Sequence, residues 1–186
     1  MKIYPVILPI SDRSKSGRES IAIQRKVALE ALRLSAYKQG IILQKLEKDE
    51  WGAPLPCEGN YWSISHKPSC VAAVVASCTT GIDIEEIKER SASLFHYVVS
   101  EEEWEIIGQR DWTNFYRVWT AKESALKLAG IGIRGLSACR IMQVIDDHHI
   151  RLNYKEQMCE VAQCIYKNHV TSVIKNDCEV EWIIPS

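Results

Sequence analysis

The spacing of hydrophobic residues predicts one helix and several strands in the first half of the chain. Between Arg18 and Gln39, apolar residues recur every three or four positions with charged residues between them, and Gly40 is placed to end the helix. Shorter apolar runs predict strands at residues 3–10, 41–45, 61–65, 70–77 and 81–87, with a turn at 51–56. Pro5 and Pro9 interrupt the first run, which is typical of an edge strand.

The second half repeats this order, with helices first and strands afterwards. Ser100 and Glu103 have the spacing of a capping box and predict a helix over 100–109, and a longer helix is expected over 112–129. Strands are expected at 139–145, 150–154, 160–166, 170–175 and 179–184. Helices beside a mostly antiparallel sheet indicate an α+β fold. We therefore expect two halves, residues 1–88 and 89–186, connected by the charged segment near residue 88.

The composition narrows the possible functions. The 186 residues are 46% hydrophobic and 25% charged, which is typical of a globular protein with a substantial core. The formal net charge of -1 provides no overall field for nucleic acid or an anionic membrane. No run approaches the roughly 20 apolar residues of a membrane span, and the N-terminus is a poor signal peptide. A cytoplasmic protein with neither a nucleic-acid nor a membrane partner is expected.

The seven cysteines are expected to be free thiols. Their number is odd, their spacing is irregular, and no C-x-x-C pair occurs. A zinc cluster is the alternative, and it would draw on Cys159, Cys164, His148, His149 and His169. The ligand pairs that tetrahedral zinc sites use are absent from the sequence, which disfavours that alternative.

A pair of acidic residues ends one of the predicted strands. In the segment Gly81-Ile-Asp-Ile-Glu85, alternation places Asp83 and Glu85 on one face of the strand. Two adjacent carboxylates repel each other, and a hard cation such as Mg²⁺ removes that repulsion by taking oxygen ligands. The alternative is a solvated strand edge that continues into the charged residues after it.

A second candidate site lies on the predicted helix over 112–129. Trp119, Glu123 and Lys127 are spaced four residues apart and therefore share one helix face, with Lys122 at its side. They would provide an aromatic wall, a third carboxylate and an ammonium group for a phosphate. The alternative is a surface Glu–Lys pair with the tryptophan in the core.

Hydroxyl and cationic groups gather at the end of the strand at 61–65. Ser63 and Ser65 share a strand face, and His66 and Lys67 follow where the strand turns, a set of donors that suits a phosphate group. A structural histidine is the alternative here. Glu103 has a similar ambiguity, because it could serve only to complete the capping box.

Together these segments resemble the 4′-phosphopantetheinyl transferases, specifically the surfactin-synthetase-activating type with two halves in one chain. The matching pieces are SISH at 63–66, GIDIEEI at 81–87, SEEEW at 100–104 and WTAKESALK at 119–127. Their order and separations match the family, over roughly half of the chain. The resemblance implies a pseudo-twofold α+β fold and a monomer with coenzyme A bound between the halves. The implied reaction is transfer of the 4′-phosphopantetheine arm to a serine of an apo acyl or peptidyl carrier protein.

The resemblance also implies roles for single residues. Asp83, Glu85 and Glu123 would hold Mg²⁺, and Asp83 would lie close to the coenzyme A pyrophosphate. The remaining roles concern proton transfer and phosphate binding. Glu103 or Glu123 would position or deprotonate the serine, Lys127 with Lys122 nearby would contact the phosphate, and Ser65 and His66 would contact the 3′-phosphate.

One position departs from the family pattern. The family has Gly-Lys-Pro before the SISH strand, and its lysine contacts coenzyme A phosphate, whereas this chain has Ala53 at the lysine position. Arg13, Arg25 and Lys67 are candidate replacements. Weaker 3′-phosphate binding without loss of activity is expected.

Two other functions are compatible with the same residues. A metal-dependent phosphodiester hydrolase would use the same carboxylates and lysine, but it would need a basic track that the charge balance does not indicate. A non-catalytic binder of coenzyme A or carrier proteins is the other. Because carrier proteins are acidic, a basic and apolar docking strip is expected near Phe95, Tyr97, Trp104 and Arg110, unless these aromatic residues belong to the core.

Overall fold

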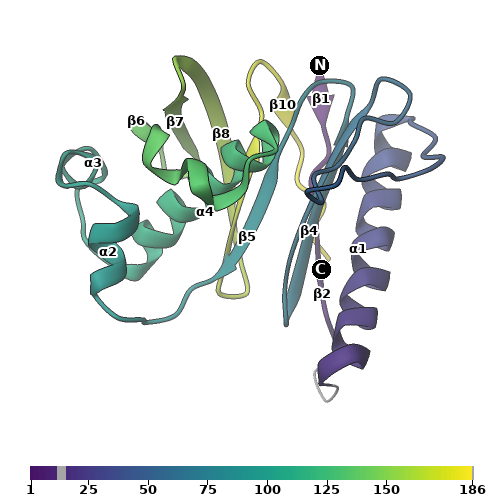
Figure 1. The fold of residues 1–186 in the computed structure, drawn as a ribbon, viewed down its shortest axis with the longest axis horizontal. Helices are drawn as coiled ribbons and strands as arrows, with labels where there is room; N and C mark the ends of the chain where they lie inside the picture. Colours follow the sequence, from purple (N-terminus) through teal and green to yellow (C-terminus); the bar gives the residue numbers. More distant parts are fainter. Residues whose placement is uncertain (12–15, 186) are drawn as a thin grey trace.

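The computed structural model describes residues 1–11 and 16–185, which form a larger sheet of five strands, a smaller sheet of three strands and a separate two-stranded pair, flanked by helices (Figure 1). The strands are β1 (Lys2–Ile3), β2 (Val6–Pro9), β3 (Tyr61–Lys67), β4 (Cys70–Ala76), β5 (Ile82–Glu86), β6 (Cys139–Asp146), β7 (His149–Tyr154), β8 (Gln157–Tyr166), β9 (His169–Ile174) and β10 (Glu179–Val180). The helices are α1 (Gly17–Gln39), α2 (Ser93–Val98), α3 (Glu101–Ile107), α4 (Trp112–Ala129) and the 3-10 helix η1 (Gly132–Ala138). The α+β class predicted from the sequence is confirmed.

The smaller sheet has the order β2-β4-β3 and is covered by α1 (Figure 1). All residues of β4 are buried because this central strand packs on both of its faces. The apolar stripe of α1 contributes Ala28, Ala31 and Leu32 to the core against β4. The helix ends at Gly40, whose φ of 71° lies in the left-handed region that glycine adopts without strain.

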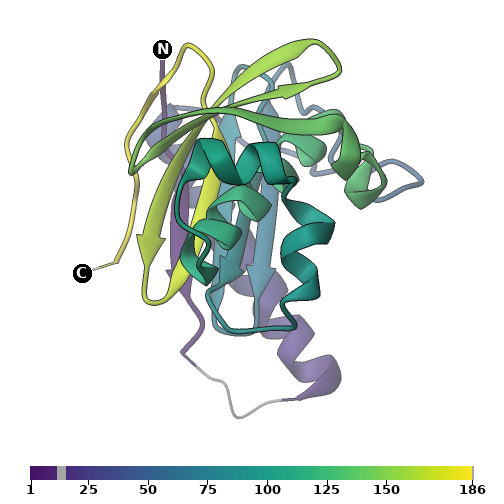
Figure 2. The same ribbon diagram turned by 90° about the vertical axis from the view of Figure 1, so that its left-hand side faces the viewer.

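The larger sheet is antiparallel, has the order β5-β9-β8-β7-β6, and is covered by α4 (Figure 2). Phe115, Val118 and Leu126 of α4 pack with Ile150 and Leu152 of β7. Asp111 caps the start of α4 by accepting a hydrogen bond from the Asn114 N–H, and Gly130 ends the helix with a φ of 69°. This helix therefore places its polar face at a fixed position relative to β5.

The two sheets share a core at β4 and β5. Ile82 and Ile84 of β5 pack with Ala72 and Val74 of β4 and with Val173 of β9, so the other face of β5 is left for its acidic residues. The segment after β9 returns to the first sheet, where β10 pairs in parallel with β1 and Ile183 bridges to Val6. Strand β5, which precedes residue 88, pairs with β9 of the larger sheet. The division into two halves at residue 88 and the pseudo-twofold relation between them stay predictions.

Gly81 allows α4 to approach β5 closely. A Cβ atom at this position would lie 2.1 Å from the Ser124 carbonyl oxygen and 2.8 Å from the Leu128 nitrogen, both of which are backbone atoms. No L residue with a side chain fits there without a shift of the helix. The glycine that begins the GIDIE segment therefore sets the separation between the strand and the helix.

Most predicted elements are present, but several details differ. No strand forms at 41–45, where Ile42 is 82% exposed, and α2 and η1 were not predicted. The last strand is also shorter than the predicted 179–184. The seven cysteines are free thiols, as predicted. Within the described residues, no helix is both long and apolar enough to cross a bilayer.

Replacing Gly81 by Ala should lower the free energy of unfolding by about 1–3 kcal/mol, because overpacking against backbone atoms cannot be relieved by side-chain rotation. Urea unfolding followed by circular dichroism measures this change. Gly135→Ala is the matched control, because its Cβ would meet only the side chains of Ile131 and Leu126, which can move. An equal loss of stability in both variants would contradict the close approach at Gly81.

Candidate functional site

The polar junction of β3, β5 and α4 is built around Asp83. Its Oδ1 accepts hydrogen bonds from Ser65 Oγ at 2.8 Å and from Lys127 Nζ at 2.8 Å, and the residue is only 4% exposed. Lys127 also donates to the carbonyl oxygens of Ile82 at 3.0 Å and Ile64 at 3.3 Å. One ammonium group from α4 therefore connects two strands that belong to different sheets.

The structure brings together all three carboxylates that the sequence singled out. Burial raises the pKa of Glu123, and the carboxylates of Asp83 and Glu85 raise it further against the opposing effect of Lys127. Burial also raises the pKa of Glu85, while its hydrogen bond with Lys67 lowers it. The Nζ of Lys67 lies 2.5 Å from Oε1 of Glu85. Three acidic groups thus share one partly desolvated region with only two lysines.

The donor set at this junction fits a small divalent cation only in part. Asp83 Oδ2 and Glu123 Oε1 are buried oxygens without a hydrogen-bond partner, which is costly unless a cation or a donor reaches them. Among the described residues, however, no three His, Cys, Asp or Glu side chains are grouped as metal ligands. Two of the three carboxylates therefore offer an unpartnered oxygen to a cation, and the three side chains are not grouped as a complete ligand set among the described residues.

Positive charges gather around His66 at the end of β3. Burial lowers the pKa of His66, and the nearby cations lower it further, in the order Lys127, Lys67, Lys48 and Arg25. These effects favour the neutral form of the imidazole in the absence of an anion. Four cations that converge on one histidine form an environment that would stabilise a phosphate group.

Lys48 belongs to this environment but was missed in the sequence. It lines a cavity of about 220 Å³ that also contains Ala53, Trp62 and Lys127. Residues 48–54 form an ordered turn in which Asp49 Oδ1 accepts hydrogen bonds from the N–H groups of residues 51 and 53. A β-bridge between residues 48 and 54 places Lys48 next to Ala53, the position at which the family motif has a lysine. Arg13, another candidate, lies outside the described residues.

Ser63 and Ser65 point inward from β3. The Ser63 hydroxyl accepts a hydrogen bond from the Ile82 N–H at 3.1 Å, and the Ser65 hydroxyl donates to Asp83. Both residues are buried. Their hydroxyl groups thus hold β3 against β5 and orient the Asp83 carboxylate.

Glu103 and Lys122 form a separate buried ion pair. Glu103 accepts hydrogen bonds from the N–H groups of Ser100 and Ile141 as well as from Lys122, whose Nζ lies 2.7 Å from its Oε1. Lys122 also donates to the carbonyl oxygen of Val98 at 2.7 Å. The capping box between Ser100 and Glu103 is complete, which agrees with the alternative that Glu103 has a structural role. Both side chains are below 10% exposed, so neither has a free polar atom directed at a substrate.

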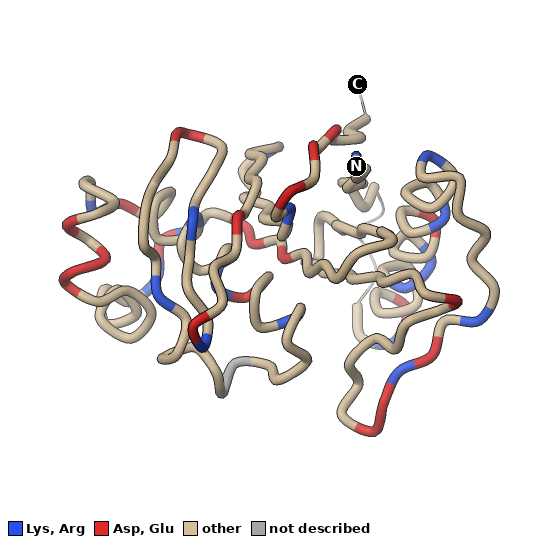
Figure 3. The backbone as a smooth tube through the Cα atoms, turned by 90° about the horizontal axis from the view of Figure 1, so that it is seen from above, with Lys and Arg blue, Asp and Glu red and all other residues tan. Residues whose placement is uncertain are grey.

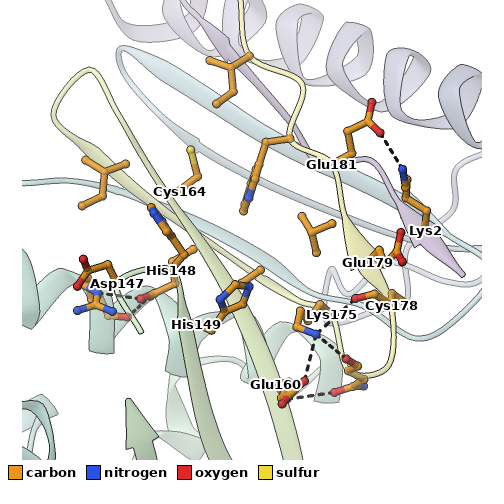
Figure 4. A pocket seen from close by; sticks show the side chains of 18 of the residues that line it. Lys2, Asp147, His148, His149, Glu160, Cys164, Lys175, Cys178, Glu179 and Glu181 are labelled. Carbon is orange, nitrogen blue, oxygen red and sulfur yellow. Dashed lines mark hydrogen bonds and ion pairs between the residues drawn. The ribbon is translucent and has the colours of Figure 1, made fainter. Parts of the chain in front are cut away.

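A large cavity lies elsewhere in the molecule, between β8 and residues 177–184 (Figure 4). Its volume is about 1230 Å³. Four of its charged groups are paired with one another, Lys2 with Glu181 and Lys175 with Glu160. None of the three carboxylates of the polar junction lines it. Cavity size therefore does not identify the candidate site in this molecule.

Comparison with known protein families shows which family the region around the polar junction matches. Residues 79–177, more than half of the 186, match the 4′-phosphopantetheinyl transferase superfamily. The chain belongs to this superfamily. The matched region begins just before Gly81 and contains all of α4, so the family assignment covers the three carboxylates and Lys127.

Curated relatives match only part of their length. The 4′-phosphopantetheinyl transferase psf-1 of Bacillus pumilus is 32% identical over 83 residues, which are 42% of this chain and 36% of that protein. The 4′-phosphopantetheinyl transferase gsp of Aneurinibacillus migulanus is 29% identical over 90 residues, which are 46% of this chain and 38% of that protein. The matched segments therefore span little more than a third of these relatives.

Two of the four residues predicted to form a docking strip for a carrier protein, Phe95 and Trp104, belong to the core instead. Phe95 and Trp104 pack edge to face, with ring centroids 5.4 Å apart, inside an aromatic cluster of the core. Arg110 is paired with Glu101. Tyr97 is 70% exposed and stays available. Acidic residues mark the α3 end of the molecule (Figure 3), which does not suit an acidic partner.

Lys122→Met should lower the free energy of unfolding by about 3–5 kcal/mol, because it leaves the buried Glu103 carboxylate without its cation. Urea unfolding is the measurement. The double variant Glu103→Gln with Lys122→Met should recover part of the loss, because no unpaired charge is then buried. An unchanged stability for Lys122→Met would instead favour the predicted role of this lysine at the substrate phosphate.

Addition of inorganic pyrophosphate should raise the pKa of His66, because an anion offsets the field of the four cations that now lower it. It follows that the anion binds more tightly as the pH falls through the pKa of the occupied state. Imidazole chemical shifts followed through a pH titration measure both effects. His149, which contacts Asp146, is the internal control and should not move. A His66 titration that is unaffected by saturating anion would contradict the predicted phosphate environment.

Proposed function

We propose that this protein transfers the 4′-phosphopantetheine arm of coenzyme A to a serine of an apo acyl or peptidyl carrier protein. The products would be the modified carrier and adenosine 3′,5′-bisphosphate, and the reaction would depend on Mg²⁺. The observation that carries the proposal is the junction of Asp83, Glu123 and Lys127 inside the region that matches the superfamily. Because the match spans only part of the relatives, substrate and partners are part of the proposal.

The carboxylates would hold the cation, with Asp83, Glu85 and Glu123 as the set expected from the family resemblance. When bound, Mg²⁺ would neutralise charge on the pyrophosphate oxygens. Asp83 is already oriented for a ligand role, because Ser65 and Lys127 fix one of its oxygens and leave the other without a partner. Glu123 offers an unpartnered oxygen from the facing helix.

Lys127 would stabilise the leaving group. Its ammonium group lies at the junction, where it donates to two backbone carbonyls and to Asp83, so one of these hydrogen bonds would be exchanged for a phosphate oxygen near Asp83. The charge that develops on the departing adenosine bisphosphate would be offset there. His66 with Lys48, Arg25 and Lys67 would hold the 3′-phosphate, and Lys48 would replace the lysine that is missing at position 53.

The proton of the carrier serine has two candidate acceptors. Glu103 already accepts hydrogen bonds at both oxygens and is neutralised by Lys122, so it would have to leave its partners to act. Glu123 would face the cation with its unpartnered Oε1, so its second carboxylate oxygen would take the proton, and burial raises the pKa of Glu123, which brings a carboxylate closer to the basicity needed for proton transfer. We therefore assign the acceptor role to Glu123, and Glu103 to positioning the segment before α3.

The proposal is tested by the intact mass of an apo carrier protein incubated with this protein, coenzyme A and Mg²⁺. A gain of one phosphopantetheine group is expected, and Lys127→Met should slow it on the order of 100-fold because the developing charge loses its partner. Lys155→Met is the control, because this exposed lysine lies outside the junction. No mass gain with several carrier classes, while coenzyme A still binds, would overturn the transfer reaction in favour of a non-catalytic binder.

A further inference from the structure

Two cysteine thiols from distant parts of the chain meet beside the large cavity. Cys78 follows β4 and Cys178 precedes β10, and the two residues are 100 positions apart in the sequence. Their Sγ atoms lie 3.6 Å apart, a distance at which one thiol can donate a hydrogen bond to the other. Cys178 is buried and lines the cavity (Figure 4), whereas Cys78 is only partly buried. A reagent in solution therefore reaches Cys78 more easily than Cys178.

Hydrogen bonds hold the backbone on both sides of this thiol pair. Two residues after Cys78, the Thr80 hydroxyl donates to the Ile174 carbonyl oxygen at 3.1 Å. The Ile174 N–H donates in turn to the Gly81 carbonyl oxygen at 2.9 Å. The Cys178 N–H donates at 2.8 Å to a carbonyl oxygen of the turn after β9. Both cysteines also pack against the core that β4 shares with β5, so ordered segments bring the two thiols together.

We propose that Cys78 and Cys178 are a dithiol site that a low-molecular-weight disulfide, such as oxidised glutathione, converts reversibly into a disulfide bond. The Cys78 thiolate attacks one sulfur of oxidised glutathione, which releases one glutathione thiolate and leaves a mixed disulfide on Cys78. Cys178 then attacks the Cys78 sulfur, and its proton passes to the second glutathione thiolate as that group departs. Two protein thiols are thereby oxidised, and one glutathione disulfide is reduced to two thiols.

The contact between the two thiols suits a disulfide better than a metal ion. The sulfur atoms need to approach by only about 1.5 Å to reach the bond length of about 2.05 Å. Burial and the hydrogen bond with Cys178 raise the pKa of Cys78 to about 11, which favours thiols over the thiolates that metal ions bind. Among the described residues, no group of three His, Cys, Asp or Glu side chains is arranged to hold a metal ion.

A bond at this position would close a long loop that includes strands of both sheets. It would join the connection between β4 of the smaller sheet and β5 of the larger sheet to the segment in which β10 pairs with β1. Closing a loop of about 100 residues removes conformational freedom from the unfolded chain, so oxidation stabilises the folded protein. The same connection continues into β5, and the bond therefore also restrains the strand that carries Asp83.

The test is incubation of the folded, whole chain with oxidised glutathione at about pH 8, followed by intact mass and by peptide mapping without reductant. The parent protein should lose about 2 Da, the mass of two hydrogen atoms, and a cross-linked peptide should contain Cys78 and Cys178. Cys178→Ala should instead retain glutathione on Cys78, because the thiol that resolves the mixed disulfide is missing. Cys164→Ala is the matched control, since it removes another partly buried cysteine, and it should still form the cross-link.

Two further measurements follow the same reaction. The oxidised protein should unfold at least about 5 °C above the reduced protein, and dithiothreitol should abolish the difference. The initial rate at Cys78 should rise about 10-fold per pH unit from about pH 7 to 9, because the thiolate fraction rises in that proportion below a pKa of about 11.

The inference is overturned if the folded parent forms no bond between Cys78 and Cys178, if the bond forms only in denaturant, or if oxidation leaves the thermal unfolding unchanged. Circular dichroism of each variant before oxidation verifies that folded proteins are compared. None of these readouts involves coenzyme A or a carrier protein. The disulfide can therefore be established or refuted whether or not the proposed transfer reaction is observed.

Discussion

The contact between Lys127 and the two strands beside it is the interaction on which the polar junction depends. Its ammonium group reaches the Ile64 carbonyl on β3, the Ile82 carbonyl on β5 and the Asp83 carboxylate. Those two strands belong to different sheets and form no ladder with each other. Electrostatic attraction from a helix, supported by the Ser63 hydroxyl, thus takes the place that backbone pairing has within a sheet.

The charges at the junction differ in kind from the charges elsewhere in the chain. The Glu103–Lys122 pair is closed, because every polar atom has a partner and the pair fixes α3 against β6. The junction around Asp83 is open, because two carboxylate oxygens are buried without partners. Satisfied pairs stabilise a fold, whereas unsatisfied groups persist where a ligand completes them. This contrast distinguishes the structural Glu103 from Glu123, for which a functional role is proposed, although both lie in motif segments of the sequence.

Local signals in the sequence predicted α1, α3 and α4, and long-range contacts account for much of what was missed. Gly40, Gly130 and the capping box at Ser100 mark helix ends through their own backbone requirements. Segment 41–45 has the apolar content of a strand but finds no strand edge to pair with among the described residues. Alternation placed the acidic residues of β5 on one face, yet the contact of Glu85 with Lys67 depends on the packing of β3 beside it. Lys48 could not be recognised for the same reason, since a turn and not a motif brings it to the cavity.

The absence of a side chain at residue 81 has a mechanical consequence. Helix and strand touch backbone to backbone there, so a displacement of α4 must carry β5, and with it both unpartnered carboxylate oxygens, in the same direction. The turn at 48–54 meets the end of α4 more loosely, with a Cβ at Gly130 coming no closer than 3.7 Å to the Ala53 side chain. The contact between α4 and β5 is therefore the stiffer part of the polar junction, and the turn at 48–54 is the more adaptable part. A bound molecule of different size or shape would displace this turn before it displaced α4 or β5.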